Sequence, residues 1–290
     1  GTYWCHSHSG LQEQIGHYGP IIFDPAEPDP VQYDREHVIV LSDWSFMHPH
    51  LIFERLKQEG GFFNRQKLTV VDRLSGKNPL TPAERDMFAR MRMDPTDIAD
   101  ITAATYTYLI NGHSPQENWT GIFRPGERVR LRIINSATQT TFNFRMPGLE
   151  MTVVAADGIN IQPVQTDEFQ IGNAETYDVI VTPGDRAYSI VTESIDRSGM
   201  GVATLAPRAG MRAAVPPLRE RPVLHMADMG MSMGGDQWMH GIAGMDHTGT
   251  AGTDPSNMSG MAQSASGHAA TTPAGPTANA PMDHGKMSMR

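Results

Sequence analysis

The chain has 290 residues, with 23 Lys and Arg against 32 Asp and Glu, which gives a formal net charge of −9. This acidic balance argues against nucleic acid as a partner, and no apolar run approaches the roughly 18–20 residues of a membrane-spanning helix. Cys5 is the single cysteine, so neither an internal disulfide framework nor a cysteine-based zinc site is expected.

His6 and His8 stand two residues apart in the opening run GTYWCHSHSGLQEQ. The run is aromatic and prone to form a strand, in which residues two apart point to the same face. Their Cβ atoms would then lie roughly 6–7 Å apart, which is wide for one ion but suits two adjacent ions. Imidazole is a common ligand of copper, zinc and iron, although two ordinary surface histidines remain an alternative at this point.

Residues 1–33 are expected to form two strands and an exit segment, with an apolar second strand over Gly19–Asp24 and the linker PAEPDP after it. This stretch is too short to be a domain. Because the chain opens at Gly1 within a strand-like motif rather than at a Met, we expect it to be a fragment of a longer protein.

Residues 34–207 contain short strands separated by turn signals, which is the pattern of a β-sandwich or barrel. Arg128–Ile134 alternates, with its apolar residues on one face and arginines on the other. The turns Arg124–Glu127 and Thr182–Asp185 have Pro-Gly at their centre, which fits type II geometry. The other expected strands are His37–Leu41, Tyr106–Ile110, Met151–Ala155, Glu168–Ile171, Tyr177–Val181 and Tyr188–Thr192.

A helical insertion interrupts the strands between about residues 48 and 100. The sequence Thr81-Pro82-Ala83-Glu84 combines a capping box with proline at the first helical position, and it opens a helix to about Arg92. Leu51–Lys57 is expected to be another short helix.

Residues 208–290 are rich in Gly, Ala, Ser, Thr, Met and His without a sustained apolar period, so we expect a disordered linker. Eleven of the 19 methionines lie at or after Met226. Thioether sulfur suits Cu(I), and imidazole suits copper in both states. The segment is therefore a candidate copper-binding tail, with an inert flexible linker as the alternative. Its candidate ligands are Met226, Met229, Met231, Met233, Met239, His240, Met245, His247, Met282 and His284.

Other candidate sites are weaker. His48-Pro49-His50 repeats the His-x-His spacing, but its proline and the helix start make it a poor metal candidate, and the remaining histidines before the tail are expected to be ordinary. Cys5 alternates onto the face opposite His6, where we expect a buried small apolar residue. A type 1 copper site needs a cysteine and two histidines. The one cysteine lies within the His6–His8 motif, so we expect no type 1 site in this chain. No hydrolase or phosphate-binding motif is present.

The N-terminal run resembles the second copper motif of multicopper oxidases, Gly-Thr-aromatic-aromatic-x-His-Ser-His-x-Gly followed by Tyr-Gly-Pro. The matching residues are Gly1, Thr2, Tyr3, Trp4, His6, Ser7, His8, Gly10, Tyr18, Gly19 and Pro20. The segments LSDW, MRMDPTDIAD, TYTYLING, NWTGIFRPGERVRLRIIN, PGLEMTVVAADG and AETYDVIV resemble the second cupredoxin domain of CopA-type copper-resistance oxidases. The resemblance covers roughly residues 1–210, and Cys5 departs from the Tyr that is common in this family.

The resemblance implies an all-β, cupredoxin-like Greek-key sandwich with a short helical insertion. It divides the chain into the end of a first cupredoxin domain (1–33), a second cupredoxin-like domain (34–207) and a Met/His-rich linker (208–290). It further implies that His6 and His8 are catalytic, each ligating one of the two type 3 coppers of a trinuclear cluster. The type 1 copper and the remaining ligands would lie outside this chain, in first-domain and third-domain segments of the same protein.

The function implied is that of a periplasmic copper-resistance oxidase, with its signal peptide outside this chain. It would couple one-electron oxidation of Cu(I) or a phenol to reduction of dioxygen to water, with copper ions and dioxygen as partners. The cluster takes eight histidines in the family and this chain supplies two, so we expect the chain alone to be inactive. Two alternatives remain: a non-catalytic protein that sequesters copper through its tail, and a structural cupredoxin-type domain.

Overall fold

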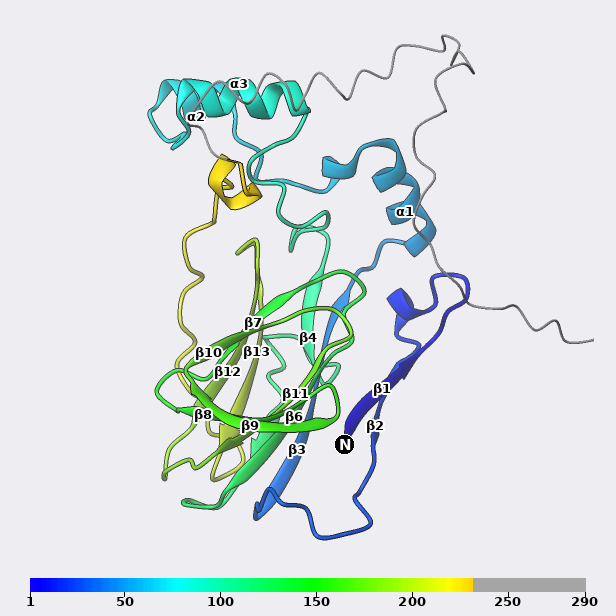
Figure 1. The fold of residues 1–290 in the computed structure, drawn as a ribbon, viewed down its shortest axis with the longest axis vertical. Coiled ribbons are helices and arrows are strands. Elements are labelled where there is room, and N and C mark those ends of the chain that lie inside the picture. The colour runs from blue at the N-terminus through cyan, green and yellow to red at the C-terminus, as the bar shows by residue number, and fades with distance from the viewer. Residues whose placement is uncertain (232–290) are drawn as a thin grey trace, which may run out of the picture. The chain divides into compact units, whose positions relative to one another are not determined.

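The computed structural model describes residues 1–231, which form a sandwich of two main sheets with a two-stranded ribbon beside them (Figure 1). The six-stranded sheet has the order β4 (Thr107–Ile110), β3 (Arg35–Trp44), β6 (Val129–Asn135), β11 (Thr176–Val181), β8 (Met151–Ala156), β9 (Ile159–Thr166). The five-stranded sheet has the order β10 (Glu168–Ile171), β7 (Phe142–Arg145), β12 (Tyr188–Ser194), β13 (Met200–Ala206), β5 (Thr120–Ile122). The expected all-β sandwich is confirmed.

The sandwich core lies between the two main sheets. Leu131 and Ile133 of β6 are fully buried there, as are Phe142 and Phe144 of β7. Burial of such apolar side chains is the main favourable contribution to folding. The alternation expected for Arg128–Ile134 is confirmed on its apolar face.

The arginines of β6 lie on its other face, as expected, and the structure buries them there. Arg130 and Arg132 are only 2% and 1% exposed, because the ribbon of β1 (Thr2–His6) and β2 (Tyr18–Ile22) lies over them. The Asp178 carboxylate of β11 lies 2.5 Å from Nη2 of Arg130 and 3.3 Å from Nη1 of Arg132. Thr2 completes the layer, since its hydroxyl donates to Asp178 at 2.7 Å and accepts from Arg132 at 3.0 Å. The ribbon is thus joined to the sheet by buried polar groups.

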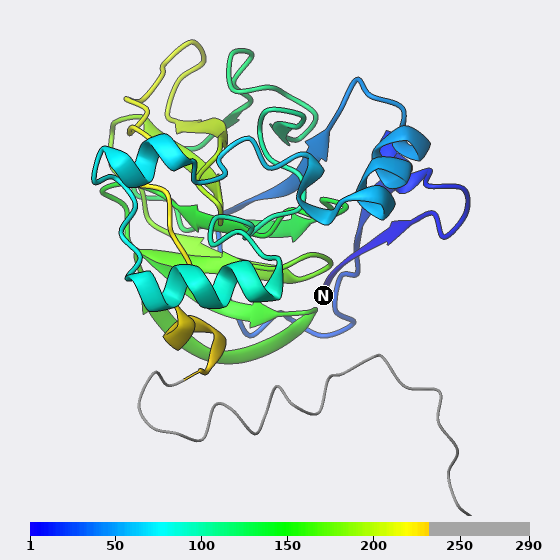
Figure 2. The ribbon, with the colours of Figure 1, turned by 90° about the horizontal axis from the view of Figure 1, so that it is seen from above.

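Three helices cover one end of the sandwich, as Figure 2 shows from above. They are α1 (Pro49–Gln58), α2 (Val70–Leu74) and α3 (Pro82–Met91). The capping box predicted for α3 is confirmed, with the Glu84 N–H 3.2 Å from the Thr81 hydroxyl. The helix α2 was not expected, although Thr69 and Asp72 form a capping box there as well. None of the helices in residues 1–231 is long and apolar enough to cross a membrane.

One of the two expected type II turns is confirmed. Gly126 has φ +85°, the left-handed value that position i+2 of a type II turn requires. Gly184 lacks a positive φ and instead donates its N–H to the Tyr188 hydroxyl at 3.0 Å, so the second assignment is wrong. The Pro-Gly pairs of the two turns therefore have different backbone conformations.

Residues 208–231 are ordered against the domain, although a disordered linker was expected from 208 onward. Arg219 pairs with Glu193 of β12 at 2.5 Å and with Glu168 of β10 at 2.9 Å. The segment ends in the short 3-10 helix η3 (Met226–Met229). Ion pairs and the buried side chain of Met226 hold this stretch in place. Neither feature produces an apolar period in the sequence. The remaining part of the expected linker lies outside the described residues.

Candidate metal centre

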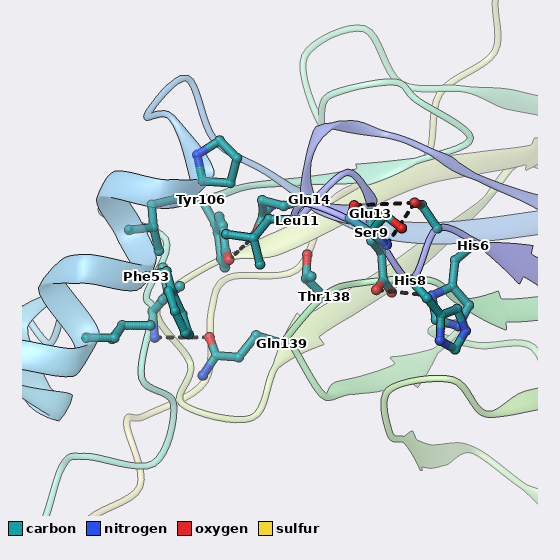
Figure 3. Close-up of a pocket in the computed structure, with 15 residues that line it drawn as sticks. His6, His8, Ser9, Leu11, Glu13, Gln14, Phe53, Tyr106, Thr138 and Gln139 are labelled. Atoms are coloured by element: carbon teal, nitrogen blue, oxygen red, sulfur yellow. Dashed lines mark hydrogen bonds and ion pairs between the residues drawn. The ribbon is translucent and has the colours of Figure 1, made fainter.

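His6 and His8 lie side by side at the end of the ribbon (Figure 3). Their ring centroids are 4.6 Å apart with an interplanar angle of 29°. His6 is the last residue of β1, and His8 lies just beyond the strand rather than within it. Trp4 stacks on the other side of His6, with centroids 4.4 Å apart, as the two-residue periodicity of a strand requires. The shared face predicted for the two histidines is therefore found.

A tight loop carries the chain from His8 back to the second strand. The Ser7 N–H donates to the His17 carbonyl at 3.0 Å, and the Ser7 hydroxyl donates to Gln12 Oε1 at 2.7 Å. Gly10 and Leu11 both adopt φ values of +59°, which reverse the chain direction. This loop returns η1 (Glu13–Ile15) to the histidines.

Glu13 orients His6. Its Oε2 lies 3.2 Å from Nδ1 of His6, so a protonated Nδ1 donates to the carboxylate and Nε2 is left to bind a metal ion. Histidine ligands in metalloproteins commonly have such a partner, which fixes the tautomer and the ring orientation. Sequence reasoning missed Glu13, because seven residues and a turn separate it from His6.

A cavity of about 420 Å³ adjoins the two histidines and extends beneath α1. Figure 3 shows Phe53 and Tyr106 at the end opposite the histidines. The Tyr106 hydroxyl donates to Gln14 Oε1 at 2.5 Å, and burial raises the pKa of Tyr106 above its ordinary value, so it stays protonated. The lining residues are His6, Ser7, His8, Ser9, Leu11, Glu13, Gln14, Pro49, Ile52, Phe53, Leu56, Ile101, Tyr106, Thr138 and Gln139.

Asp43, at the end of β3, fixes the loop that closes one side of this cavity. Its buried carboxylate accepts from the backbone and hydroxyl of Thr138 at 3.0 and 2.9 Å, and from those of Thr140 at 3.1 and 2.8 Å. A buried carboxylate with this many donors has its charge compensated without a cation. These hydrogen bonds hold the side of the cavity formed by Thr138 and Gln139 in place.

The donor set fits copper. Two adjacent imidazoles, one with its Nδ1 held by a carboxylate, are nitrogen ligands of the kind copper prefers. Among residues 1–231, no group of three or more His, Cys, Asp and Glu side chains is placed to hold a metal ion. The pair would therefore form part of a site that takes further ligands from elsewhere.

Cys5 does not have the burial expected of it. It lies on the ribbon face opposite His6, as predicted, but it is exposed, and its thiol faces the Gly19 carbonyl at 3.6 Å. The expectation of a buried apolar residue is wrong because the described chain places no layer over this face of the ribbon.

The candidate tail ligands fall into two groups. Met226 is fully buried against Leu80 and Phe88, and Met229 and Met231 pack around it. These three were expected in a disordered tail, and the structure instead places them in an apolar cluster. The candidates that lie outside the described residues are Met233, Met239, His240, Met245, His247, Met282 and His284.

The weaker His-x-His pair has a structural role. His48 is the N-cap of α1, and its Nδ1 accepts the His50 N–H at 3.3 Å. The two rings stack with centroids 5.4 Å apart. His48 thereby satisfies one of the free N–H groups at the helix start.

The fold and the histidine pair agree with comparisons to known proteins. A family model described as multicopper oxidase matches residues 35–215. Copper resistance protein A of Escherichia coli is 54% identical over 260 residues, covering 88% of this chain and 42% of that protein. A copper resistance protein A homolog of Pseudomonas syringae pv. tomato is 51% identical over 251 residues, covering 85% and 41%.

The crystal structure of a laccase from Botrytis aclada shares the fold, with a TM-score of 0.51 and 23% identity over 77% of this chain and 38% of that one. The chain thus spans less than half the length of these relatives. The family model covers more than half of the chain and lies on the sandwich described above. On this evidence, the chain belongs to the multicopper oxidase family.

Proposed function

We propose that this chain is part of a periplasmic copper-resistance oxidase. The whole protein would couple one-electron oxidation of a substrate, Cu(I) or a phenol, to the reduction of dioxygen to water. The observation that carries the proposal is the His6–His8 pair, with rings 4.6 Å apart and Glu13 holding Nδ1 of His6. The 54% identity to copper resistance protein A supports the copper-resistance role.

In this proposal His6 and His8 each hold one copper of a type 3 pair through Nε2. When bound, such a cluster supplies the electrons that reduce dioxygen. Glu13 keeps the His6 ring in place, and the cavity beside the pair leaves room for a small molecule next to the histidines. The other ligands and the type 1 copper would come from first-domain and third-domain segments of the longer protein.

The parts of the chain would have different tasks. Residues 1–33 would end the first cupredoxin domain and carry the copper ligands. Residues 34–207 would form a second cupredoxin-like domain that supports them, through the buried contacts of Thr2 with Asp178 and Arg132. The Met/His-rich part from 208 onward would lead to a third domain.

The test uses the full-length protein that contains this chain. His6→Ala and His8→Ala should each abolish dioxygen consumption and lower the copper content, while the blue type 1 colour is kept. The matched control is the pair His48→Ala and His50→Ala, because these residues have the same spacing and also stack, but His48 caps the helix in which His50 lies. Undiminished turnover in the His6 and His8 variants would rule out the type 3 assignment.

The second candidate is copper sequestration by the Met/His-rich segment. It is favoured by the concentration of methionines at and after Met226, among histidines and glycines. Thioether and imidazole groups bind Cu(I) without any of the oxidase machinery. Replacing the methionines after residue 231 with leucine should lower the number of Cu(I) ions bound per chain, and an unchanged number would contradict this candidate.

A further inference from the structure

Trp4 lies in contact with both the histidine pair and the sandwich. Its ring stacks on that of His6, with centroids 4.4 Å apart and an interplanar angle of 15°. The His8 ring stacks on the opposite side of His6, with centroids 4.6 Å apart. The His6 ring is therefore held between two other rings, and it cannot tilt without separating from one of them.

The indole N–H ties Trp4 to a distant part of the chain. Nε1 of Trp4 donates to the Ala174 carbonyl at 3.2 Å, across 170 residues of sequence. Ala174 lies in the turn that joins β10 to β11, at the end of the six-stranded sheet. A tryptophan whose ring is stacked and whose N–H is paired has a fixed orientation.

The turn that accepts this hydrogen bond is itself held firmly. Asn135, the last residue of β6, is fully buried, and its side-chain amide donates to the carbonyls of Ile171 and Gly172 at 3.1 and 3.0 Å. The Ala174 N–H donates to the Asn135 carbonyl at 3.0 Å. The Glu175 carboxylate accepts the Gly172 N–H at 2.6 Å. The acceptor for Trp4 is therefore part of a rigid corner of the sheet.

Ordinary core packing does not account for Trp4. Its side chain is only half-buried, and it is not a member of the apolar core formed by the described residues. Glu13, the other group that contacts the His6 ring, lies in the same N-terminal segment as His6 and bonds Nδ1 at 3.2 Å. That bond fixes the tautomer, whereas the Trp4 stack fixes the plane of the ring and connects it to the sandwich.

We propose that Trp4 is a positioning residue through which the sandwich sets the orientation of the His6 ring for copper binding. The inference rests on the proposed function, from which it takes the role of His6 as a copper ligand. The connection runs from the corner held by Asn135, through the Ala174 carbonyl and the indole, to the imidazole. It gives residues 34–207 a specific effect on the copper centre.

The first experiment uses nuclear magnetic resonance on the 290-residue chain without metal. Protons above an aromatic ring are shielded, so the ring protons of His6 should resonate upfield, and His6→Ala identifies their signals. Trp4→Leu should move these signals downfield, and Trp4→Phe should keep part of the upfield shift because it keeps a ring. Unchanged His6 signals in Trp4→Leu would overturn the proposal without any reference to copper.

The second experiment measures copper retained by the full-length protein during dialysis against a graded chelator. Trp4→Leu should weaken retention at least about tenfold, as loss of a residue that supports a metal ligand does. The matched control is Trp119→Leu, because Trp119 also contacts a histidine, His37, edge-on with centroids 5.7 Å apart. If Trp119→Leu weakened retention as much as Trp4→Leu, the effect would come from general destabilisation and the proposal would be wrong.

A double-variant comparison tests the connection to the turn. Glu175→Ala removes the acceptor of the Gly172 N–H and loosens the turn without touching the ribbon. It should weaken copper retention in the wild-type background and have no further effect in Trp4→Phe, which lacks the indole N–H. Equal effects in both backgrounds would show that the turn does not act through Trp4.

His6→Ala distinguishes a failure of this inference from a failure of the oxidase proposal. If His6→Ala lowered copper retention and Trp4→Leu did not, Trp4 would not position the ligand, and the type 3 assignment would stand. If neither variant lowered copper retention, the type 3 assignment would fail. The His6 signals of the metal-free chain would then still show whether Trp4 orients the ring.

Discussion

At the residue scale, the orientation of His6 depends on Glu13. Removing the carboxylate with Glu13→Leu frees the ring, so copper bound by the pair in the full-length protein should be held about 10- to 100-fold less tightly. Glu13→Gln keeps a carbonyl acceptor for Nδ1–H and should restore much of the loss. The measurement is copper retained during dialysis against a graded chelator.

A matched control is Glu59→Leu, which removes an exposed carboxylate paired with Lys67 at 2.7 Å. Copper retention should not change in this variant. If Glu13→Leu and the wild-type protein retained equal amounts of copper, Glu13 would not support His6 as a copper ligand, even if oxidase turnover changed.

The histidines could be predicted and their partner could not. The shared face of His6 and His8 follows from the two-residue period of a strand, which is a local property of the backbone. Glu13 reaches His6 only because Gly10 and Leu11 turn the chain with positive φ, and nothing in the sequence demands that value of a leucine. Cys5 is exposed for a related reason, since burial depends on which distant segment covers a face.

At the element scale, the buried carboxylate of Asp178 is one of the groups that hold the ribbon on the six-stranded sheet. Asp178→Asn would leave Arg130 and Arg132 with less compensation in a layer that water does not reach. Loss of one partner from such a buried pair costs about 3–5 kcal/mol of unfolding free energy. Chemical denaturation of the purified chain measures this difference.

The comparison variant is Asp86→Asn, which breaks the exposed Arg90–Asp86 pair on α3. Exposed pairs contribute about 0–1 kcal/mol, so its unfolding curve should nearly overlay that of the wild-type chain. If Asp178→Asn cost no more than Asp86→Asn, the buried layer would not be holding the ribbon.

The α3–η3 junction gives a pH-dependent prediction. The Thr81 backbone N–H and His225 lower the pKa of Glu84 from its ordinary 4.5 to about 2. A carboxylate whose pKa is lowered on folding stabilises the fold at pH values above its ordinary pKa. This contribution is lost as the pH falls through the pKa of the folded state. The wild-type advantage over Glu84→Gln should therefore be constant above pH 4.5 and shrink as the pH falls from 4.5 toward 2.

Thermal unfolding of the two proteins across that range measures the effect. Glu117→Gln is a suitable comparison, because Ser114 lowers the pKa of Glu117 through local hydrogen bonds that involve no distant segment. A difference between the wild-type chain and Glu84→Gln that grew on acidification would have the wrong sign and contradict the assignment.

Strand prediction succeeded where the pattern was local. The alternation of β6 identified its core face, but the burial of Arg130 and Arg132 follows from a ribbon more than 120 residues earlier in the chain. β7 and β13 were both missed, and β13 gives little strand signal because it contains a glycine and two alanines. The capping box of α3 was recognisable because all its groups lie within four residues.

At the scale of the whole molecule, each main sheet of the sandwich holds one flanking segment. The ribbon that carries His6 lies on the six-stranded sheet, where Thr2 contacts Asp178 of β11 and Arg132 of β6. The segment that follows the sandwich is paired through Arg219 with Glu168 and Glu193 of the five-stranded sheet. The His6–His8 pair offers two ligands and needs more from parts of the protein beyond the sandwich.

The two attachments should contribute independently to stability. Thr2 and Arg219 have no partner in common, so the losses of unfolding free energy in Thr2→Ala and Arg219→Ala should add, as those of independent sites do. Chemical denaturation of the two single variants and of the double variant measures the sum. A double variant that lost markedly less than the sum would show that the ribbon and the segment after the sandwich stabilise each other through the core.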